Sequence, residues 1–87
     1  MNINVGQIRQ IKRIKVIGGL SIERFEGVQV RIGSSSDVFG NELVHTVTGF
    51  SERYGTYEIT FDAPIEGSYV GFVKKDHVQI CKIEIYQ

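Results

Sequence analysis

The sequence predicts an all-β domain, and three observations indicate this. Short runs of β-branched and aromatic residues alternate with polar residues, glycines separate the runs, and the 87-residue chain contains a single proline. Such runs at nearly regular spacing are typical of antiparallel sandwiches and barrels. Because 87 residues allow one core of modest size, we expect a single domain over residues 1–87.

The first expected strand covers residues 12–17, where polar and apolar side chains alternate up to Gly18 and Gly19. Glycine pairs interrupt strands, so the strand is expected to end there. Isoleucines at positions 8, 11, 14 and 17 also fit a helical stripe. A helix is therefore the alternative, because short apolar runs fit both periods.

The second expected strand covers residues 27–32. Its apolar side chains, Val28, Val30 and Ile32, point to one face and its polar side chains to the other. One face is therefore expected to lie on the core and one in solvent. A glycine- and serine-rich loop follows, then a weaker run over residues 43–47.

The second half of the chain contains three further runs. Residues 57–61 alternate cleanly, residues 62–67 contain Pro64 and predict a turn, and residues 69–73 form the next strand. In the last strand, residues 78–86, strict alternation places Cys81, Ile83 and Ile85 on the core face. It places Val78 and Ile80 on the opposite face.

Charge and cysteine content restrict the function classes. Ten basic residues balance ten acidic ones, so no global field attracts nucleic acid and we expect no nucleic-acid partner. Residues 1–31 hold six basic and two acidic residues, a charge of +4, and residues 32–87 hold four and eight, a charge of −4. A single cysteine, Cys81, allows no internal disulfide.

Targeting signals are not apparent. No apolar run reaches the roughly 20 residues of a membrane helix, and residues 1–10 lack the order of a signal peptide. We therefore expect no transmembrane segment, and the compartment is left open.

Four segments together resemble the F-type lectins (fucolectins), which belong to the discoidin, or coagulation factor 5/8 type C, superfamily. They occur in the family's order and are residues 2–7, 23–33, 67–70 and 80–86. The resemblance implies an antiparallel β-sandwich of jelly-roll, galactose-binding-domain-like topology. It covers only the later part of the family's domain, so the sandwich is expected to be incomplete. It also implies a secreted, extracellular protein.

An incomplete sandwich leaves open sheet edges and an apolar face, which invite association. We expect a homodimer or a partner chain that covers them. The chain is then either a fragment or a natural part-domain.

The resemblance implies a damaged sugar site. The family holds fucose with a histidine from the earlier half and two basic residues around an aspartate. Arg24 matches the second basic residue, but Ile17 stands at the first and Gly19 at the aspartate. Leu20 and Ser21 stand where the family has a cysteine pair.

The family's calcium site is also altered. The carboxylate that follows the family cysteine is replaced by Lys82, and a cation is a poor substitute for a hard oxygen ligand. We therefore expect no metal and no cofactor. Cys81 matches a family cysteine whose partner lies in the absent half, and its place on the apolar face favours a buried thiol.

Four residues are the ligand-binding candidates: Arg24, Phe50, Arg53 and Tyr54. Arg24 lies at a loop-to-strand junction and is otherwise half of a solvated pair with Glu23 or Glu26. The other three lie in the loop of residues 48–55, where an aromatic ring suits the apolar face of a sugar. The alternative for the two aromatic residues, Phe50 and Tyr54, is a place in the core or in a cross-strand pair.

Other chemistries find little support. His45 and His77 lack metal-ligand spacing, the glycine turns lack the lysine of a phosphate loop, and no carboxylate spacing demands acid–base catalysis. A basic stretch in the first strand is the weakest binding candidate, for anionic headgroups or sulfated glycans: Arg9, Lys12, Arg13 and Lys15.

These observations predict a non-enzyme that recognises glycans, a lectin-like module with a degenerate fucose site. The alternative is a structural, protein-interaction or self-association module that has lost sugar binding.

Overall fold

The computed structural model describes residues 1–75 and 78–87. Asp76 and His77, the second of the two histidines considered for a metal site, lie outside the described residues. The described elements are β1 (Asn2–Gly18), β2 (Gln29–Gly33), the short 3-10 helix η1 (Val38–Gly40), β3 (Glu42–Thr46), β4 (Thr56–Val73) and β5 (Ile80–Tyr86). The prediction of an all-β fold is confirmed, and residues 8–17 belong to a strand rather than a helix.

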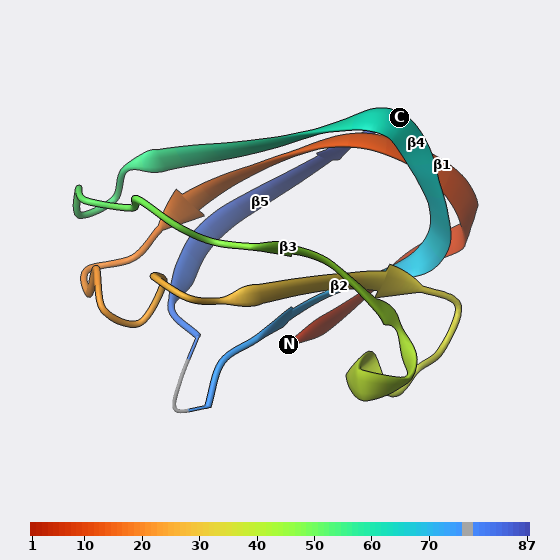
Figure 1. Cartoon of the computed structure of the whole chain (residues 1–87), viewed down its shortest axis with the longest axis horizontal. Coiled ribbons are helices and arrows are strands. Elements are labelled where there is room, and N and C mark those ends of the chain that lie inside the picture. Colours follow the sequence, from red (N-terminus) through yellow and green to blue (C-terminus); the bar gives the residue numbers. More distant parts are fainter. Residues whose placement is uncertain (76–77) are drawn as a thin grey trace.

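All five strands form one antiparallel sheet in the order β3-β2-β4-β1-β5. β1 and β4 are long strands that bend together, so the sheet folds over itself into two layers (Figure 1). One layer contains β5 with the end of β1 and the start of β4. The other contains β3 and β2 with the end of β4 and the start of β1.

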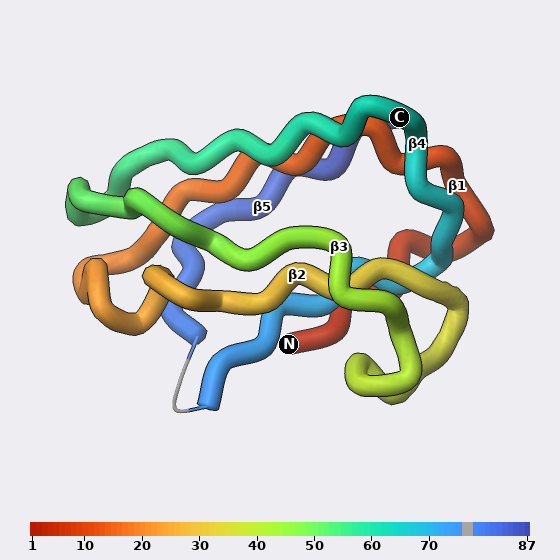
Figure 2. Tube along the Cα trace, in the orientation of Figure 1, coloured from red at the N-terminus to blue at the C-terminus, as the bar shows by residue number. Residues whose placement is uncertain are grey.

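Two irregularities produce the bend. In the β1–β4 ladder, Asn4 pairs with Tyr69 and Arg9 with Gly67, so four residues of β1 lie opposite one of β4. Further on, Ile11 pairs with Ile65 and Arg13 with Thr60, so the excess residues are now on β4. Extra residues on one strand bend it, and the tube in Figure 2 shows both strands turning together there.

The expected turn at residues 62–67 is therefore wrong. These residues belong to β4, which is continuous through the bend, and Pro64 lies in the stretch without a pairing partner on β1. Proline has no N–H for a ladder and is tolerated at such a bulge. Likewise, the expected strands 2–7 and 12–17 are one strand, β1.

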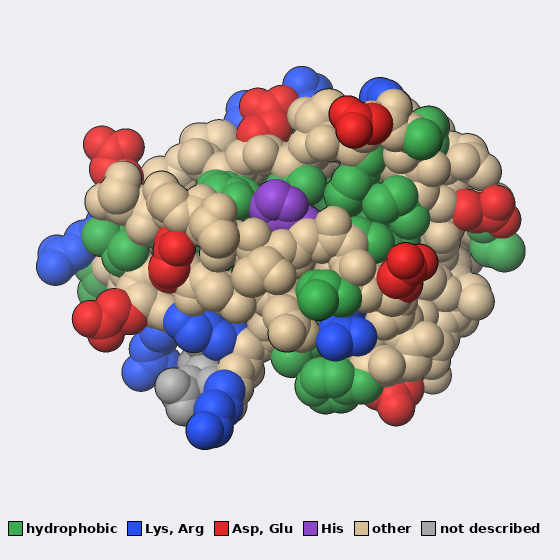
Figure 3. All heavy atoms as spheres, viewed as in Figure 1, with side chains coloured by type: hydrophobic (Ala, Val, Ile, Leu, Met, Phe, Trp, Pro, Cys, Tyr) green, Lys and Arg blue, Asp and Glu red, His purple; other side chains and the backbone are tan. Residues whose placement is uncertain are grey.

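The core lies between the two layers. Val28, Val30 and Ile32 are buried, with at most 2% exposed, as their alternation predicts. The remaining buried hydrophobic side chains come from β1, from β4 and from the segments at residues 25 and 47–50: Ile11, Ile14, Val16, Phe25, Val47, Phe50, Ile59, Phe61, Val70 and Phe72. Figure 3 views one side of this sandwich, and hydrophobic side chains reach the surface there between β3 and β4.

The face assignment in β5 needs correction. Cys81 is exposed, not buried. β1 pairs Ile17 with Lys82 and the next residue, Gly18, with Ile80, so Cys81 is the extra residue of a bulge. The bulge interrupts strict alternation, and Ile80 packs against the core together with Ile83 and Ile85.

In residues 1–75 and 78–87, the structure contains no helix long and apolar enough to cross a membrane.

Candidate functional site

The candidate site is one end of the sandwich, which we call the loop end and define as the turn 20–27 and the loop 48–55. The turn follows β1 and the loop precedes β4, and both lie at the left of Figure 1. Several Lys and Arg side chains lie at this end of the molecule in Figure 3. Segments far apart in sequence therefore meet at one end of the fold.

Glu26 fastens the turn to the loop. Its Oε1 accepts a hydrogen bond from the Gly49 N–H at 2.9 Å, and its Oε2 accepts one from the Phe50 N–H at 2.8 Å. Backbone bonds add to this link, with Gly27 N–H donating to Val47 O at 2.9 Å. Hydrogen bonds to a carboxylate are stronger than neutral ones, so Glu26 sets the position of the loop relative to the turn.

Two further polar side chains hold the turn from the opposite flank. Gln79 Oε1 accepts from the Ser21 N–H at 2.7 Å. The ammonium group of Lys74 donates to the carbonyl oxygens of Glu23 and Glu26. The backbone of the turn is therefore fixed by the residue that follows β4 and by the residue that precedes β5.

Phe50 does not serve as an exposed contact, and that expectation is wrong. Its ring is only 7% exposed and packs edge-on against Phe25, with the ring centroids 4.6 Å apart. A Cβ at Gly18 would overlap this ring, so the close approach requires glycine there. Phe50 anchors the loop in the core.

The other three candidates do lie on the surface of the loop end. Arg24 and Arg53 are exposed, and Tyr54 is 56% exposed. Arg24 forms no ion pair with Glu23 or Glu26 in the described part of the chain, because Glu26 is engaged with the loop. Their polar heads are therefore available to a ligand.

Tyr54 has a strained backbone, with φ of 54°. Left-handed backbone is uncommon for residues other than glycine, and such strain is frequent at binding sites. The conformation is held by hydrogen bonds from Tyr54 N–H to Gly19 O at 3.1 Å and from Gly55 N–H to Glu52 O at 2.9 Å. These bonds fix the loop where the tyrosine ring leaves it.

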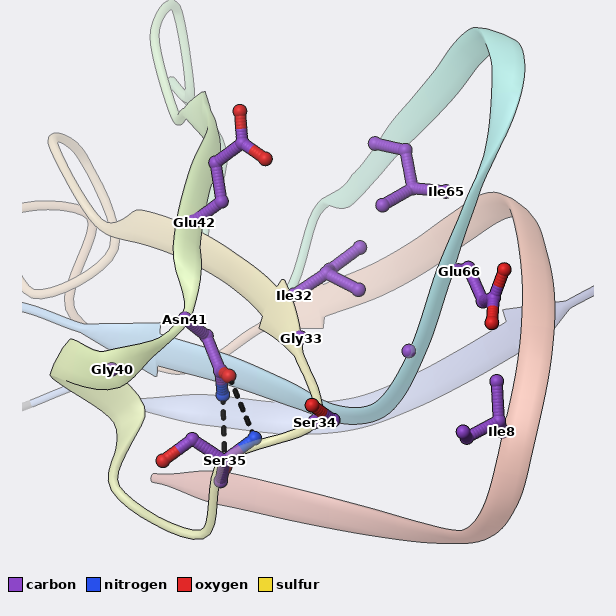
Figure 4. A pocket seen from close by; sticks show the side chains of 11 residues that line it. Ile8, Ile32, Gly33, Ser34, Ser35, Gly40, Asn41, Glu42, Ile65 and Glu66 are labelled. Atoms are coloured by element: carbon purple, nitrogen blue, oxygen red, sulfur yellow. Dashed lines mark hydrogen bonds between the residues drawn. The ribbon is translucent and has the colours of Figure 1, made fainter.

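The opposite end of the sandwich contains a hollow of about 380 Å³ between β1, β2, β3 and β4 (Figure 4). Asn41, 5% exposed, braces its wall: Oδ1 accepts from Ser35 N–H at 2.9 Å, and Nδ2 donates to Ser35 O at 3.0 Å. Ile8, Ile32 and Ile65 supply apolar side chains to a lining that is otherwise largely polar. No sequence pattern predicted this hollow, because its lining residues come from four strands and the loop of η1.

The basic stretch of β1 offers little free charge. Arg13 pairs with Glu58 at 3.0 Å and its guanidinium lies 4.3 Å from the centre of the Tyr86 ring. Lys12 donates to Asp62 O at 3.0 Å, and Arg9 to Val5 O at 3.2 Å. Intramolecular partners therefore occupy most of these cations.

His45 is a half-buried residue of β3. Its Nε2 lies 2.8 Å from the Tyr57 hydroxyl, which also accepts from Thr48 N–H at 3.2 Å. Burial lowers the pKa of His45, so the neutral ring is favoured, and the tautomer of that ring sets which of the two groups donates. The pair joins β3 to the start of β4 across the open side of the sandwich.

Within the described residues, no three His, Cys, Asp or Glu side chains gather closely enough to hold a metal ion. Lys82, at the position that the resemblance assigns to calcium, is exposed on β5.

No family model matches the sequence, and no curated protein matches it. Among solved structures, the chain is similar to an F-type lectin (fucolectin) from the serum of the striped bass, Morone saxatilis. The TM-score is 0.82 at 21% sequence identity, and the match covers 97% of this chain. The chain has the fold of an F-type lectin.

The match covers 31% of the bass protein's chain. This similarity in fold confirms the predicted fold class, an antiparallel all-β sandwich of the F-type lectin kind.

Proposed function

We propose that this chain is a non-catalytic carbohydrate-recognition module that binds glycans at its loop end. The likeness to a protein described as a lectin supports the general class. The geometry of the loop end supports the location. Loops held on a rigid β-scaffold are the usual place for recognition residues.

One observation carries the proposal. Glu26, Lys74 and Gln79 are used to fix the backbone of the turn and loop, whereas Arg24, Arg53 and Tyr54 project from the same segments into solvent. A fixed backbone with free cationic and aromatic side chains is preorganised for a ligand with hydroxyl groups and an apolar ring face.

The roles follow from the chemistry of the side chains. Arg24 and Arg53 would donate charge-assisted hydrogen bonds to sugar oxygens. Tyr54 would stack against the apolar face of the ring. Phe50 would act indirectly, by anchoring the loop that carries Arg53 and Tyr54.

The grip differs from the one that the resemblance implies for fucose. Ile17 lies half-buried in β1 and Gly19 is buried, so neither position offers a polar side chain to a sugar. Recognition would instead use Arg24 from the turn together with Arg53 and Tyr54 from the loop. We therefore propose a rebuilt site with a sugar preference of its own.

A glycan array probed with the wild-type chain tests the proposal, with and without calcium. We expect selective binding that is independent of calcium and is reduced at least about tenfold by Arg24→Ala or Tyr54→Ala, since each removes a contact worth about 1.4 kcal/mol. Phe39→Ala is the matched control for the tyrosine, because Phe39 is an aromatic residue 66% exposed on η1.

Arg9→Ala, a change of the same type away from the loop end, is the control for Arg24. A folded wild-type chain that binds no glycan on the array would overturn the proposal. So would binding that the loop-end and control variants weaken equally.

A further inference from the structure

β5 is an edge strand with a free flank. It pairs with β1 on one side and ends the strand order of the sheet on the other. An exposed edge strand presents unpaired N–H and C=O groups to any strand that can match it. Its outward face carries Lys82 and Glu84, whose Nζ and Oε1 atoms lie 3.7 Å apart.

The core is less well covered at this flank than at its centre. Ile14 and Val16 of β1 are fully buried, whereas their partners on β5, Ile85 and Ile83, are only partly buried. A hollow of about 340 Å³ opens beside Ile85, lined also by Val5, Ile11 and Tyr86. A strand added along β5 would cover these apolar side chains.

The charges on β5 make it complementary to itself. Two antiparallel β5 strands related by a two-fold axis can keep their core faces on the same side of the joined sheet. The axis must then pass between the two copies of one residue, so that this residue lies opposite itself. An axis at Lys82 or at Glu84 places like charges opposite each other. An axis at Ile83 places Lys82 of each copy opposite Glu84 of the other, and opposite charges across strands are stabilising.

The same register continues a row of alternating charge across the sheet. Glu58 of β4 pairs with Lys15 of β1, and Lys15 pairs with Glu84 of β5. In the paired arrangement, Lys82 of the second copy follows Glu84 in this row. Each charged side chain of this row then has at least one cross-strand neighbour of opposite charge.

The edges formed by the start of β4 and by β3 do not have such self-complementary charge. The start of β4 carries Glu58 and Asp62 and no basic residue between them, so two copies would repel. β3 carries Glu42 and neither Lys nor Arg. We therefore propose that two copies of the chain associate by antiparallel pairing of their β5 strands about a two-fold axis at Ile83, joining two five-stranded sheets into one.

Charge reversal on β5 tests this pairing by sedimentation equilibrium over concentrations from about 10 to about 500 µM, the range in which a small interface assembles. We expect the wild type to dimerise and to do so less well as salt increases. Lys82→Glu and Glu84→Lys each turn two attractive pairs per dimer into repulsive ones, so each should weaken self-association at least about tenfold.

Two recovery experiments separate lost pairing from lost folding. An equimolar mixture of the Lys82→Glu and Glu84→Lys chains should form a heterodimer, because every cross-strand pair is then attractive. The double variant K82E/E84K should recover self-association. Lys75→Glu, the same charge change at an exposed residue outside the strands, is the matched control and should associate like the wild type.

A wild-type chain that stays monomeric over the whole range would overturn the proposal. Single reversals that associate as well as the wild type, or a mixture that does not recover association, would overturn it too. The result is independent of glycan binding, which involves the loop end.

Discussion

The two ends of the sandwich use polar side chains differently. At the hollow end, Asn41 turns both of its polar atoms back on Ser35, and Arg31 donates to the Asn41 carbonyl oxygen at 3.0 Å. At the loop end, Glu26 braces the backbone from within the turn, and Lys74 and Gln79 brace it from the positions just after β4 and just before β5. The exposed side chains of Arg24, Arg53 and Tyr54 are therefore not needed to brace the backbone of the loop end.

This difference shows how one small fold can separate stability from recognition. In the wall of the hollow, both polar atoms of the Asn41 side chain already have a partner within the protein. The side chains of Arg24, Arg53 and Tyr54 form no hydrogen bond within the described part of the chain. A ligand would therefore not have to displace a protein partner. Three changes test this comparison.

The largest effect on stability is expected at the hollow end. Asn41→Ala removes both hydrogen bonds to Ser35 at a site 5% exposed. The Ser35 N–H loses its acceptor, and the Ser35 carbonyl oxygen keeps only the longer bond from Asn2 Nδ2 at 3.4 Å. We expect a loss of about 3 kcal/mol in the free energy of unfolding, measured by urea denaturation, because each unsatisfied buried group costs about 1–3 kcal/mol.

Glycan affinity measured on the folded fraction should stay unchanged in the same variant. Asn41→Asp keeps the acceptor for the Ser35 N–H and should be less destabilised. Equal loss of glycan affinity and stability in Asn41→Ala would show that the two ends are coupled rather than independent.

A smaller loss of stability with a larger loss of binding is expected at Glu26. Glu26→Ala removes the acceptor of the Gly49 and Phe50 amides and should cost about 2 kcal/mol, since the site is only partly shielded from water. The loop then loses its fixed position, and glycan affinity should fall at least about tenfold.

Glu26→Gln retains one acceptor oxygen and is expected to lie between the wild type and the alanine variant in both measurements. Unchanged glycan affinity in Glu26→Ala would contradict the claim that the position of the loop matters for binding.

The smallest effect concerns the His45–Tyr57 pair, which belongs to neither end. Burial lowers the pKa of His45 in the folded state, so the unfolded chain binds more protons at this group. The contribution is fully present above the unfolded pKa of 6.5 and is lost as the pH falls below it towards the folded value.

Urea denaturation at a pH above and a pH below this window measures the loss in the wild type. His45→Gln cannot titrate and should show a smaller loss over the same interval. An equal dependence on pH in the two proteins would assign the effect to other groups.

The sequence predicted the parts of the fold that depend on local alternation. The core face of residues 28–32, with Val28, Val30 and Ile32, followed directly from the period of two. The strand over residues 12–17 was also predicted, because its alternation outweighed the helical spacing of its isoleucines.

Features that depend on pairing between distant strands could not be predicted. Pro64 and Gly67 indicated a turn, but the bulges against β1 let β4 continue through the bend. The bulge at Cys81 reversed its expected face, because bulges are set by the partner strand. Strict alternation within one strand contains no information about its neighbour.

The candidate site shows the same difference between local sequence pattern and contacts across the fold. Arg24, Arg53 and Tyr54 were found from their place in polar loops, and the structure leaves them exposed at one end. Phe50 lies in the same loop but faces Phe25, which is distant in sequence. Glu26, Lys74 and Gln79 gave no recognisable signal, because their roles depend on contacts across the fold.

The most direct test of the account is a map of backbone amide shifts by NMR, recorded while the ligand that binds best on the array is added to the chain. We expect the shifts to concentrate in residues 20–27 and 48–55 and to leave the residues around Asn41 unchanged. Shifts centred on the hollow lined by Ile8, Ile32 and Ile65, with a silent loop end, would contradict the assignment of the glycan site.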